Sequence, residues 1–204
     1  NNLVFIEDAA HALGASYKNR PVGSISDMTA FSLHPVKNIT TGEGGLVVTD
    51  NLKYAERMRK FRNHGITRDY HQRQLQGAWS YDMEEIGYNY RLTELNSVLG
   101  LSQLQKLSGL VSRRKRIASC YDEAFAQLSQ MTPPIEVSNC KSAWHLYVIK
   151  LNLENLNRNR DEIFQALRCE NIGVNVHYIP VPWLDYYKKL GYKKDNWPVA
   201  EAMF

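Results

Sequence analysis

Three short apolar segments near the start of the chain indicate its fold class. They cover residues 3–7, 29–33 and 45–49, and each has the length and composition of a strand in a buried sheet. Asp50 follows the third segment and is placed to cap a helix. One face of that helix would bury Leu52, Ala55, Met58 and Phe61. Strands that alternate with helices predict an α/β layer fold.

The rest of the chain predicts a long loop, a long helix and a smaller unit. Residues 64–90 are polar and aromatic, and a loop of that length is usually functional. Thr93 is placed to cap a helix that continues to about Leu128, before the Met-Thr-Pro-Pro run ends it. A strand at 144–151, a helix at 161–169 and a strand at 173–179 follow. These patterns predict domains at 1–130 and 131–204.

The composition argues against three kinds of protein. The net charge of +4 is mild, and the one basic run, Arg113–Arg116, favours a solvated helix face over a nucleic-acid site. No stretch reaches the roughly 18 apolar residues of a membrane span. The three cysteines have no metal-ligand spacing, so we expect no metal and a reducing, cytoplasmic compartment. Because the chain opens within a strand and without methionine, we expect it to be a fragment.

Four residues in the first 40 carry groups that could do chemistry. Asp8 follows the first strand, at the carboxyl end where open α/β sheets place their ligands, and His11 would share its face in a helical turn. Ser32 and Lys37 lie on either side of Pro35, which stiffens the bend between them. Three of them also have an ordinary explanation: Asp8 as a helix cap, His11 as a hydrogen-bonded core histidine and Lys37 as a surface charge.

Lys37 is followed by a glycine-rich turn, Thr-Thr-Gly-Glu-Gly-Gly, at residues 40–45. Glycines let a backbone pass closely beneath a ligand, and a buried ammonium without a partner would be costly. An amine nucleophile, a carboxylate for a pyridinium nitrogen and a hydroxyl for a phosphate are together what pyridoxal phosphate requires. His34, three residues before Lys37, could be a proton shuttle or a structural hydrogen-bonding group.

Residues 7–50 closely resemble the DegT/DnrJ/EryC1/StrS family of sugar aminotransferases, which are fold-type I pyridoxal phosphate enzymes acting on nucleotide-linked ketosugars. Three later segments are most similar to the members that work in pseudaminic acid biosynthesis. These are RNHGITRD at 62–69, GYNYRLTELNSVLGLSQLQKL at 87–107 and GVNVHYIPV at 173–181. The resemblance extends over essentially the whole chain. It implies a partial large domain followed by a small C-terminal α+β domain.

The resemblance also implies a role for each candidate residue. Lys37 would be the lysine that is covalently attached to the cofactor, and Asp8 would hold the pyridine nitrogen protonated. His11 would contact the ring near its phenolic oxygen, where many members have glutamine. Ser32 would bind the phosphate, and Asn89 would reach the phosphate of the neighbouring subunit's cofactor. The phosphate loop and stacking aromatic residue of the family are absent here, so the first strand would lack neighbours.

The function that the resemblance implies is amino transfer from L-glutamate to the 4-keto group of a UDP-linked 6-deoxy-hexose, in a homodimer with shared active sites. Related dehydratases carry histidine in place of the lysine, so Lys37 favours transamination. The alternatives are another nucleotide-sugar aminotransferase, such as one that makes 4-amino-4-deoxy-arabinose, a dehydratase of the same family, or a non-catalytic fragment that retains the fold.

Overall fold

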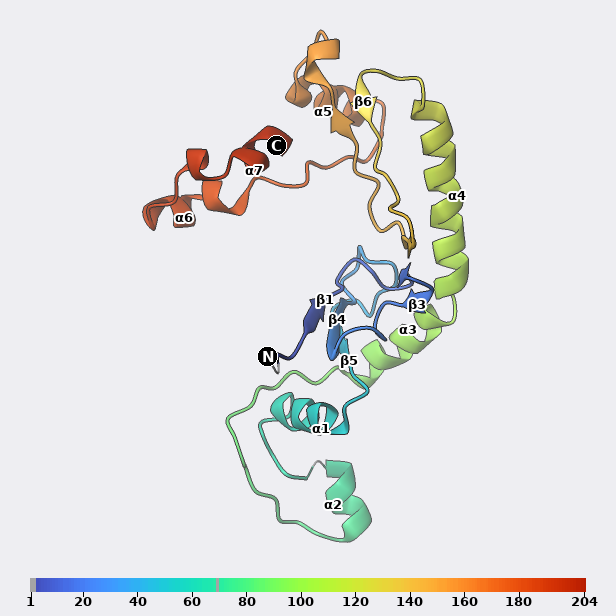
Figure 1. Ribbon diagram of the computed structural model, residues 1–204. Helices are drawn as coiled ribbons and strands as arrows, with labels where there is room; N and C mark the ends of the chain where they lie inside the picture. The colour runs from blue at the N-terminus through green and yellow to red at the C-terminus, as the bar shows by residue number, and fades with distance from the viewer. Residues whose placement is uncertain (1–2, 69) are drawn as a thin grey trace. The chain divides into compact units, whose positions relative to one another are not determined.

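A three-stranded sheet holds the first apolar segments side by side (Figure 1). Its strands are β1 (Ile6–Asp8), β4 (Met28–Ser32) and β5 (Gly45–Val48), in the order β1–β4–β5. β1 is parallel to β4, and β5 is antiparallel to it. The structure confirms the predicted strands, although their ends differ by a few residues. The expectation that the first strand lacks neighbours is wrong for one side, where β1 pairs with β4, whereas no described strand pairs with its other side.

The computed structural model describes residues 3–68 and 70–204; residue 69, inside the predicted 64–90 loop, lies outside this range. Contacts divide the chain into two units, one of residues 1–118 with 136–145 and one of residues 119–135 with 146–204. The expected domains at 1–130 and 131–204 stay a prediction. In the first unit, β2 (Ser16–Tyr17) lies between β3 (Arg20–Pro21) and β7 (Cys140–Lys141) in a second, antiparallel sheet.

The helix after β5, α1 (Leu52–Phe61), begins one residue later than the sequence predicts. Asn51, not Asp50, is its N-cap, because the Asn51 side chain accepts hydrogen bonds from the backbone N–H groups of Lys53 and Tyr54. None of the α1 residues is buried, and Leu52 is 76% exposed. The expected buried face of this helix is therefore wrong for the described chain. The predicted loop at 64–90 contains a further helix, α2 (Tyr70–Gln76).

The predicted long helix is two helices, α3 (Glu94–Leu104) and α4 (Leu107–Phe125). Thr93 is the N-cap, as expected, and its hydroxyl accepts the Asn96 N–H. The break follows from the backbone: the N–H of Lys106 donates to the carbonyl of Gln103, three residues back, which interrupts the α-helical ladder. The basic run 113–116 lies on α4, as predicted. None of the described helices combines the length and apolarity that crossing a membrane requires.

The second unit contains a two-stranded sheet of β6 (Met131–Thr132) and β8 (Lys150–Leu151), and the helix α5 (Arg160–Cys169). The predicted helix at 161–169 is confirmed, whereas the predicted strand at 144–151 shortens to β8. The predicted strand at 173–179 is wrong, because no described segment pairs with it. Short helices complete the unit: η1 (Leu153–Asn155), η2 (Val181–Trp183), α6 (Asp185–Lys189), η3 (Lys194–Asn196) and α7 (Pro198–Met203).

Tyr147 fastens the start of this unit to α4. Its hydroxyl donates to Oδ1 of Asp122 at 2.7 Å, and its ring centroid lies 5.1 Å from that of Tyr121. Burial, together with the hydrogen bond and charge of Asp122, raises the pKa of Tyr147 to about 12. Because the pKa of Tyr147 is higher in the folded than in the unfolded state, its neutral form stabilises the fold. This stabilisation is fully present below the unfolded pKa of about 10 and is lost as the pH rises through the folded pKa.

We expect Tyr147→Phe to be less stable than wild type by about 1 kcal/mol near pH 8, because it loses this hydrogen bond. The difference should shrink as the pH rises from about 10 to about 12, since the stabilisation is lost as the folded-state tyrosine ionises. Urea denaturation of the full-length protein at several pH values measures this. The control is Tyr192→Phe, whose hydroxyl has no hydrogen-bond partner among residues 3–68 and 70–204. A difference that does not depend on pH would contradict the assignment.

Candidate functional site

The carboxyl ends of β1 and β4 form one edge of the first sheet. Asp8 ends β1 opposite Ala30, and Ser32 ends β4 two residues further along the same direction. The Asp8 carboxylate is exposed, and its Oδ1 accepts the N–H of Ala10 at 3.0 Å, which orients it. No lysine, arginine or histidine in the described chain lies within 4.0 Å of this carboxylate. The edge thus presents an anion and a hydroxyl together.

His11 lies in the turn that follows β1. The N–H of Ala12 donates to the carbonyl of Ala9 at 2.9 Å, so the chain forms a tight turn here rather than the start of a helix. The His11 ring centroid is 4.4 Å from that of His145, and the ring planes are inclined at 59°. The structure therefore adds His145, from residues 136–145 of the same unit, to the neighbourhood of Asp8.

A loop closed on Leu33 presents Lys37. Leu33 donates its N–H to the carbonyl of Gly44 at 2.9 Å, which continues the ladder between β4 and β5. Its carbonyl accepts two hydrogen bonds at 3.0 Å, one from the N–H of Thr41 and one from the hydroxyl of Thr40. Residues 34–40 thus leave the sheet and return to the same point.

Lys37 is half-buried within this loop, and its N–H donates to the carbonyl of His34 at 3.0 Å. Pro35 occupies the second position of that turn, where its fixed φ is favourable. No acidic side chain of the described residues lies within 4.0 Å of the Lys37 ammonium. His34 itself accepts the Val36 N–H on Nδ1 at 3.4 Å, and its Nε2 lies 3.8 Å from Glu43. One nitrogen of His34 is therefore engaged in local structure.

Two buried residues anchor the C-terminal end of the lysine loop, residues 34–40. Asn38 is 6% exposed, and its amide donates to the carbonyls of Leu13 at 2.8 Å and Ala143 at 3.4 Å. Thr41 is 1% exposed, and its carbonyl accepts a hydrogen bond from the side-chain amide of Asn96 on α3. Neither Asn38 nor Thr41 was predicted from the sequence. No local pattern marks them, because Asn38 and Ala143 are 105 positions apart.

Asn89 lies on a different segment. The backbone of Asn89 forms an antiparallel bridge with Asn63, and its Oδ1 accepts two hydrogen bonds at 3.3 Å from the guanidinium of Arg91. The side chain is exposed. No described hydrogen bond or ion pair joins it to Asp8 or Lys37. The structure thus places Asp8 and Ser32 at one sheet edge, with His11 and Lys37 on the connections that leave it, and leaves Asn89 apart.

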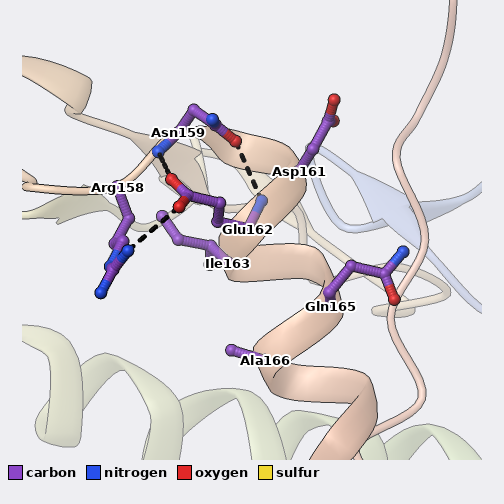
Figure 2. A pocket seen from close by; sticks show the side chains of 7 residues that line it. All are labelled: Arg158, Asn159, Asp161, Glu162, Ile163, Gln165 and Ala166. Atoms are coloured by element: carbon purple, nitrogen blue, oxygen red, sulfur yellow. Dashed lines mark hydrogen bonds and ion pairs between the residues drawn. The ribbon is translucent and has the colours of Figure 1, made fainter.

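A surface pocket lies at the start of α5, and polar side chains that line it cap that helix. Figure 2 shows the Glu162 carboxylate receiving the N–H of Asn159 and the guanidinium of Arg158, while the Asn159 side chain accepts the Glu162 N–H. These partners hold the pKa of Glu162 below its usual range, with the Asn159 N–H as the larger cause. The polar atoms that the figure joins satisfy one another as a capping box. Among the described residues, no group of three or more His, Cys, Asp and Glu could hold a metal ion.

Comparison with known proteins gives matches over most or all of the chain. A family model described as the DegT/DnrJ/EryC1/StrS aminotransferase family matches residues 1–204. The UDP-4-amino-4,6-dideoxy-N-acetyl-beta-L-altrosamine transaminase of Campylobacter jejuni is 41% identical over 189 residues, which cover 93% of this chain and 48% of that protein. The chain spans about half the length of the curated relatives it matches.

Two solved structures share the fold. The PMP-form of Spr1654 from Streptococcus pneumoniae has a TM-score of 0.88 and 38% identity, covering 99% of this chain and 52% of that one. Helicobacter pylori PseC, described as an aminotransferase involved in the biosynthesis of pseudoaminic acid, has a TM-score of 0.81 and 36% identity, covering 92% of this chain and 48% of its own. The α/β aminotransferase fold expected from the sequence is confirmed.

We expect Gly44→Ala to destabilise the protein by about 1–3 kcal/mol, because the added methyl group has no room. A Cβ at this position would overlap Oγ1 of Thr41 and lie 2.9 Å from Cδ1 of Leu92. Urea denaturation of the full-length protein measures the change. The control is Gly109→Ala on α4, where a Cβ meets nothing within 4 Å and should raise helix stability by up to about 1 kcal/mol. Equal effects of the two substitutions would show that Gly44 is not tightly packed.

Proposed function

The chain belongs to the DegT/DnrJ/EryC1/StrS aminotransferase family, and from this premise we propose that the full-length protein is a pyridoxal phosphate-dependent aminotransferase of nucleotide-linked sugars. The observation that carries the proposal is that a carboxylate and an amine, both without an ion-pair partner among the described residues, lie at or just beyond the carboxyl ends of two adjacent parallel strands. Asp8 ends β1, and Lys37 lies on the loop that leaves β4, the strand parallel to β1. Neither side chain has an ion-pair partner among the described residues.

The residues present fit this cofactor. Pyridoxal phosphate offers an aldehyde to an amine, a ring nitrogen to a carboxylate and a phosphate to hydroxyl donors. Lys37, Asp8 and Ser32 supply these three groups. The Ser32 hydroxyl accepts the His34 N–H at 3.4 Å, and its own proton remains available for a phosphate oxygen. We propose that His11 contacts the ring next to Asp8, since it occupies the turn that directly follows β1.

The proposed mechanism assigns one task to each side chain. When bound, pyridoxal phosphate supplies an electron-withdrawing ring that stabilises the charge left when a proton departs from an amino-bearing carbon. The Asp8 carboxylate would hold the ring nitrogen in its charged form through a charge-assisted hydrogen bond. Lys37 would carry the cofactor, release it when the substrate amine arrives, and then remove and return the proton as general base and acid.

For the substrates, we propose L-glutamate as the amino donor and the 4-keto group of a UDP-linked 6-deoxy-hexose as the acceptor, as in pseudaminic acid biosynthesis. The similarity to the Campylobacter jejuni transaminase and to PseC supports this choice. Another nucleotide sugar is the alternative, because the spore coat polysaccharide biosynthesis protein SpsC of Bacillus subtilis is 39% identical. Lys37, in place of a histidine, favours aminotransfer over dehydration. A cytoplasmic location is also proposed, and the free state of all three cysteines supports it.

We also propose a two-fold homodimer in which Asn89 serves the cofactor phosphate of the other subunit. Asn89 is exposed and has no described link to Asp8 or Lys37 of its own chain. Apolar side chains on either side of it are open: Trp79 is 89% exposed, Ile86 85% and Leu95 86%. Apolar side chains that gather into an exposed patch often mark a surface that another subunit, or a further part of a longer polypeptide, covers. This exposure supports a shared site.

Asp8→Asn tests the function directly. We expect the full-length variant to bind pyridoxal phosphate, but its half-reaction with L-glutamate should slow more than about tenfold, a barrier change of about 1.4 kcal/mol, because the ring nitrogen loses its charge partner. Stopped-flow absorbance of the bound cofactor measures the rate. Asp50→Asn, an exposed carboxylate after β5, is the control. A smaller loss would make Asp8 only a turn cap, and a wild-type protein that neither binds the cofactor nor converts glutamate would refute the proposed function.

Subunit complementation tests the shared site. Lys37→Ala should be inactive because it lacks the amine, and Asn89→Asp should be inactive because its negative charge faces a phosphate. Mixed and re-associated, the two full-length variants should recover activity, since a heterodimer would contain one intact site of two. The assay follows product formation from L-glutamate and the UDP-linked ketosugar. Verified heterodimers without activity, or an active enzyme that sediments as a monomer, would contradict the model.

A further inference from the structure

Asn38 is the buried polar residue next to the candidate lysine. We propose that Asn38 is a positioning residue for Lys37, which it would hold where the amine can reach the cofactor; this inference rests on the proposed function. The amide of Asn38 donates to the carbonyl of Leu13 at 2.8 Å and, over a longer distance of 3.4 Å, to that of Ala143. Only 6% of the residue is exposed, so these bonds are protected from water.

The two acceptors lie on segments that reach the same site. Leu13 follows the turn that contains His11, and Ala143 precedes His145, whose ring centroid is 4.4 Å from that of His11. One amide therefore joins the lysine loop to both segments that bring a histidine to the edge of the sheet. The second segment is itself anchored, because the guanidinium of Arg114 donates to the carbonyls of residues 144 and 145 at 3.2 and 3.3 Å.

The position of Asn38 in the chain directs its effect to Lys37. The two residues share a peptide bond, so fixing Asn38 also fixes the peptide plane that begins at Lys37. On its other side, Lys37 is held by its hydrogen bond to the His34 carbonyl. Ile39 and Thr41, which follow, are 4% and 1% exposed. The backbone of Lys37 is thus held from both sides while its long, flexible side chain stays half-buried, and that backbone decides where the amine can reach.

The chemistry of the contact requires an amide. Both contacts use the N–H donors of Asn38, and nothing in the described chain donates to its buried Oδ1. A carboxylate at this position would have the same shape but would place negative charge against two carbonyl oxygens. Asn38→Asp should therefore disturb the loop more than Asn38→Ala, whereas a residue that only filled space would tolerate aspartate.

The test uses full-length holoenzyme loaded with pyridoxal 5'-phosphate. The first readout is the pH at the midpoint of the change in the cofactor's absorption band, measured without substrate. It reports the protonation of the lysine nitrogen that is attached to the cofactor. We expect Asn38→Ala, which adds no charge, to shift this midpoint because the lysine sits differently, and Asn38→Asp, which also adds a carboxylate, to shift it by at least about 0.5 pH unit. The second readout is kcat for L-glutamate, which should fall by about tenfold or more while KM changes less than about threefold. Asn38→Ala should show smaller changes in the same direction.

The matched control is Asn152→Ala, which removes an amide-to-carbonyl hydrogen bond of 2.8 Å to Ser129 in the other unit. It should lower Tm without moving the midpoint or kcat. If the Asn38 variants also lower only Tm, Asn38 is structural and the proposal is overturned. If Asn38→Asp does not fold, Asn38→Ser, which keeps one donor, must give values between wild type and Asn38→Ala. A wild-type protein without cofactor binding would overturn the proposed function itself, and with it this inference.

Discussion

The carbonyl of Leu33 accepts two hydrogen bonds, one from the Thr41 N–H and one from the Thr40 hydroxyl. The conformation of the loop that carries Lys37 depends on them. They make residues 34–40 a closed loop instead of an extension of β4. The best-buried polar groups of the first unit, Thr29, Asn38 and Thr41, lie in or next to this part of the chain. Because most buried polar groups are hydrogen-bonded, the bonds donated by the Asn38 amide N–H groups and by the Thr41 hydroxyl also fix the backbone on the C-terminal side of Lys37.

The unpaired charges at the edge of the sheet would suit a binding site, and the half-buried ammonium of Lys37 would otherwise gain from an acidic partner. An anion at Asp8 and a cation at Lys37 could have neutralised each other or found other partners, and among the described residues they have none. Under the proposed function this arrangement has a reason, since a cofactor with a cationic ring and an electrophilic carbon would use both groups. In this account the protein keeps its reactive groups available by fastening the backbone around them.

The sequence predicted the parts of the fold that depend on local pattern. The three strands of the first sheet, the cap at Thr93, and the positions of Asp8 and Ser32 at the ends of β1 and β4 follow from apolar runs and turn residues, which act over a few positions. The break at residue 105 and the irregular segment at 173–179 were not predicted, because they depend on hydrogen-bond partners that a pattern does not reveal. Asn38 was missed for the same reason, since its acceptor at Ala143 comes from a distant part of the chain.

The most direct test of the central claim, that Lys37 is the amine which carries the cofactor, is to map the covalent attachment. Full-length holoenzyme would be reduced with borohydride and digested, and its peptides would be sequenced by mass spectrometry. The account predicts a phosphopyridoxyl group on Lys37 and on no other lysine, because Lys37 combines half-burial with the absence of an acidic partner in the described chain and lies on the loop that leaves β4, the strand paired with β1. A modification on a different lysine, or none after reduction of a protein that binds pyridoxal phosphate, would contradict it.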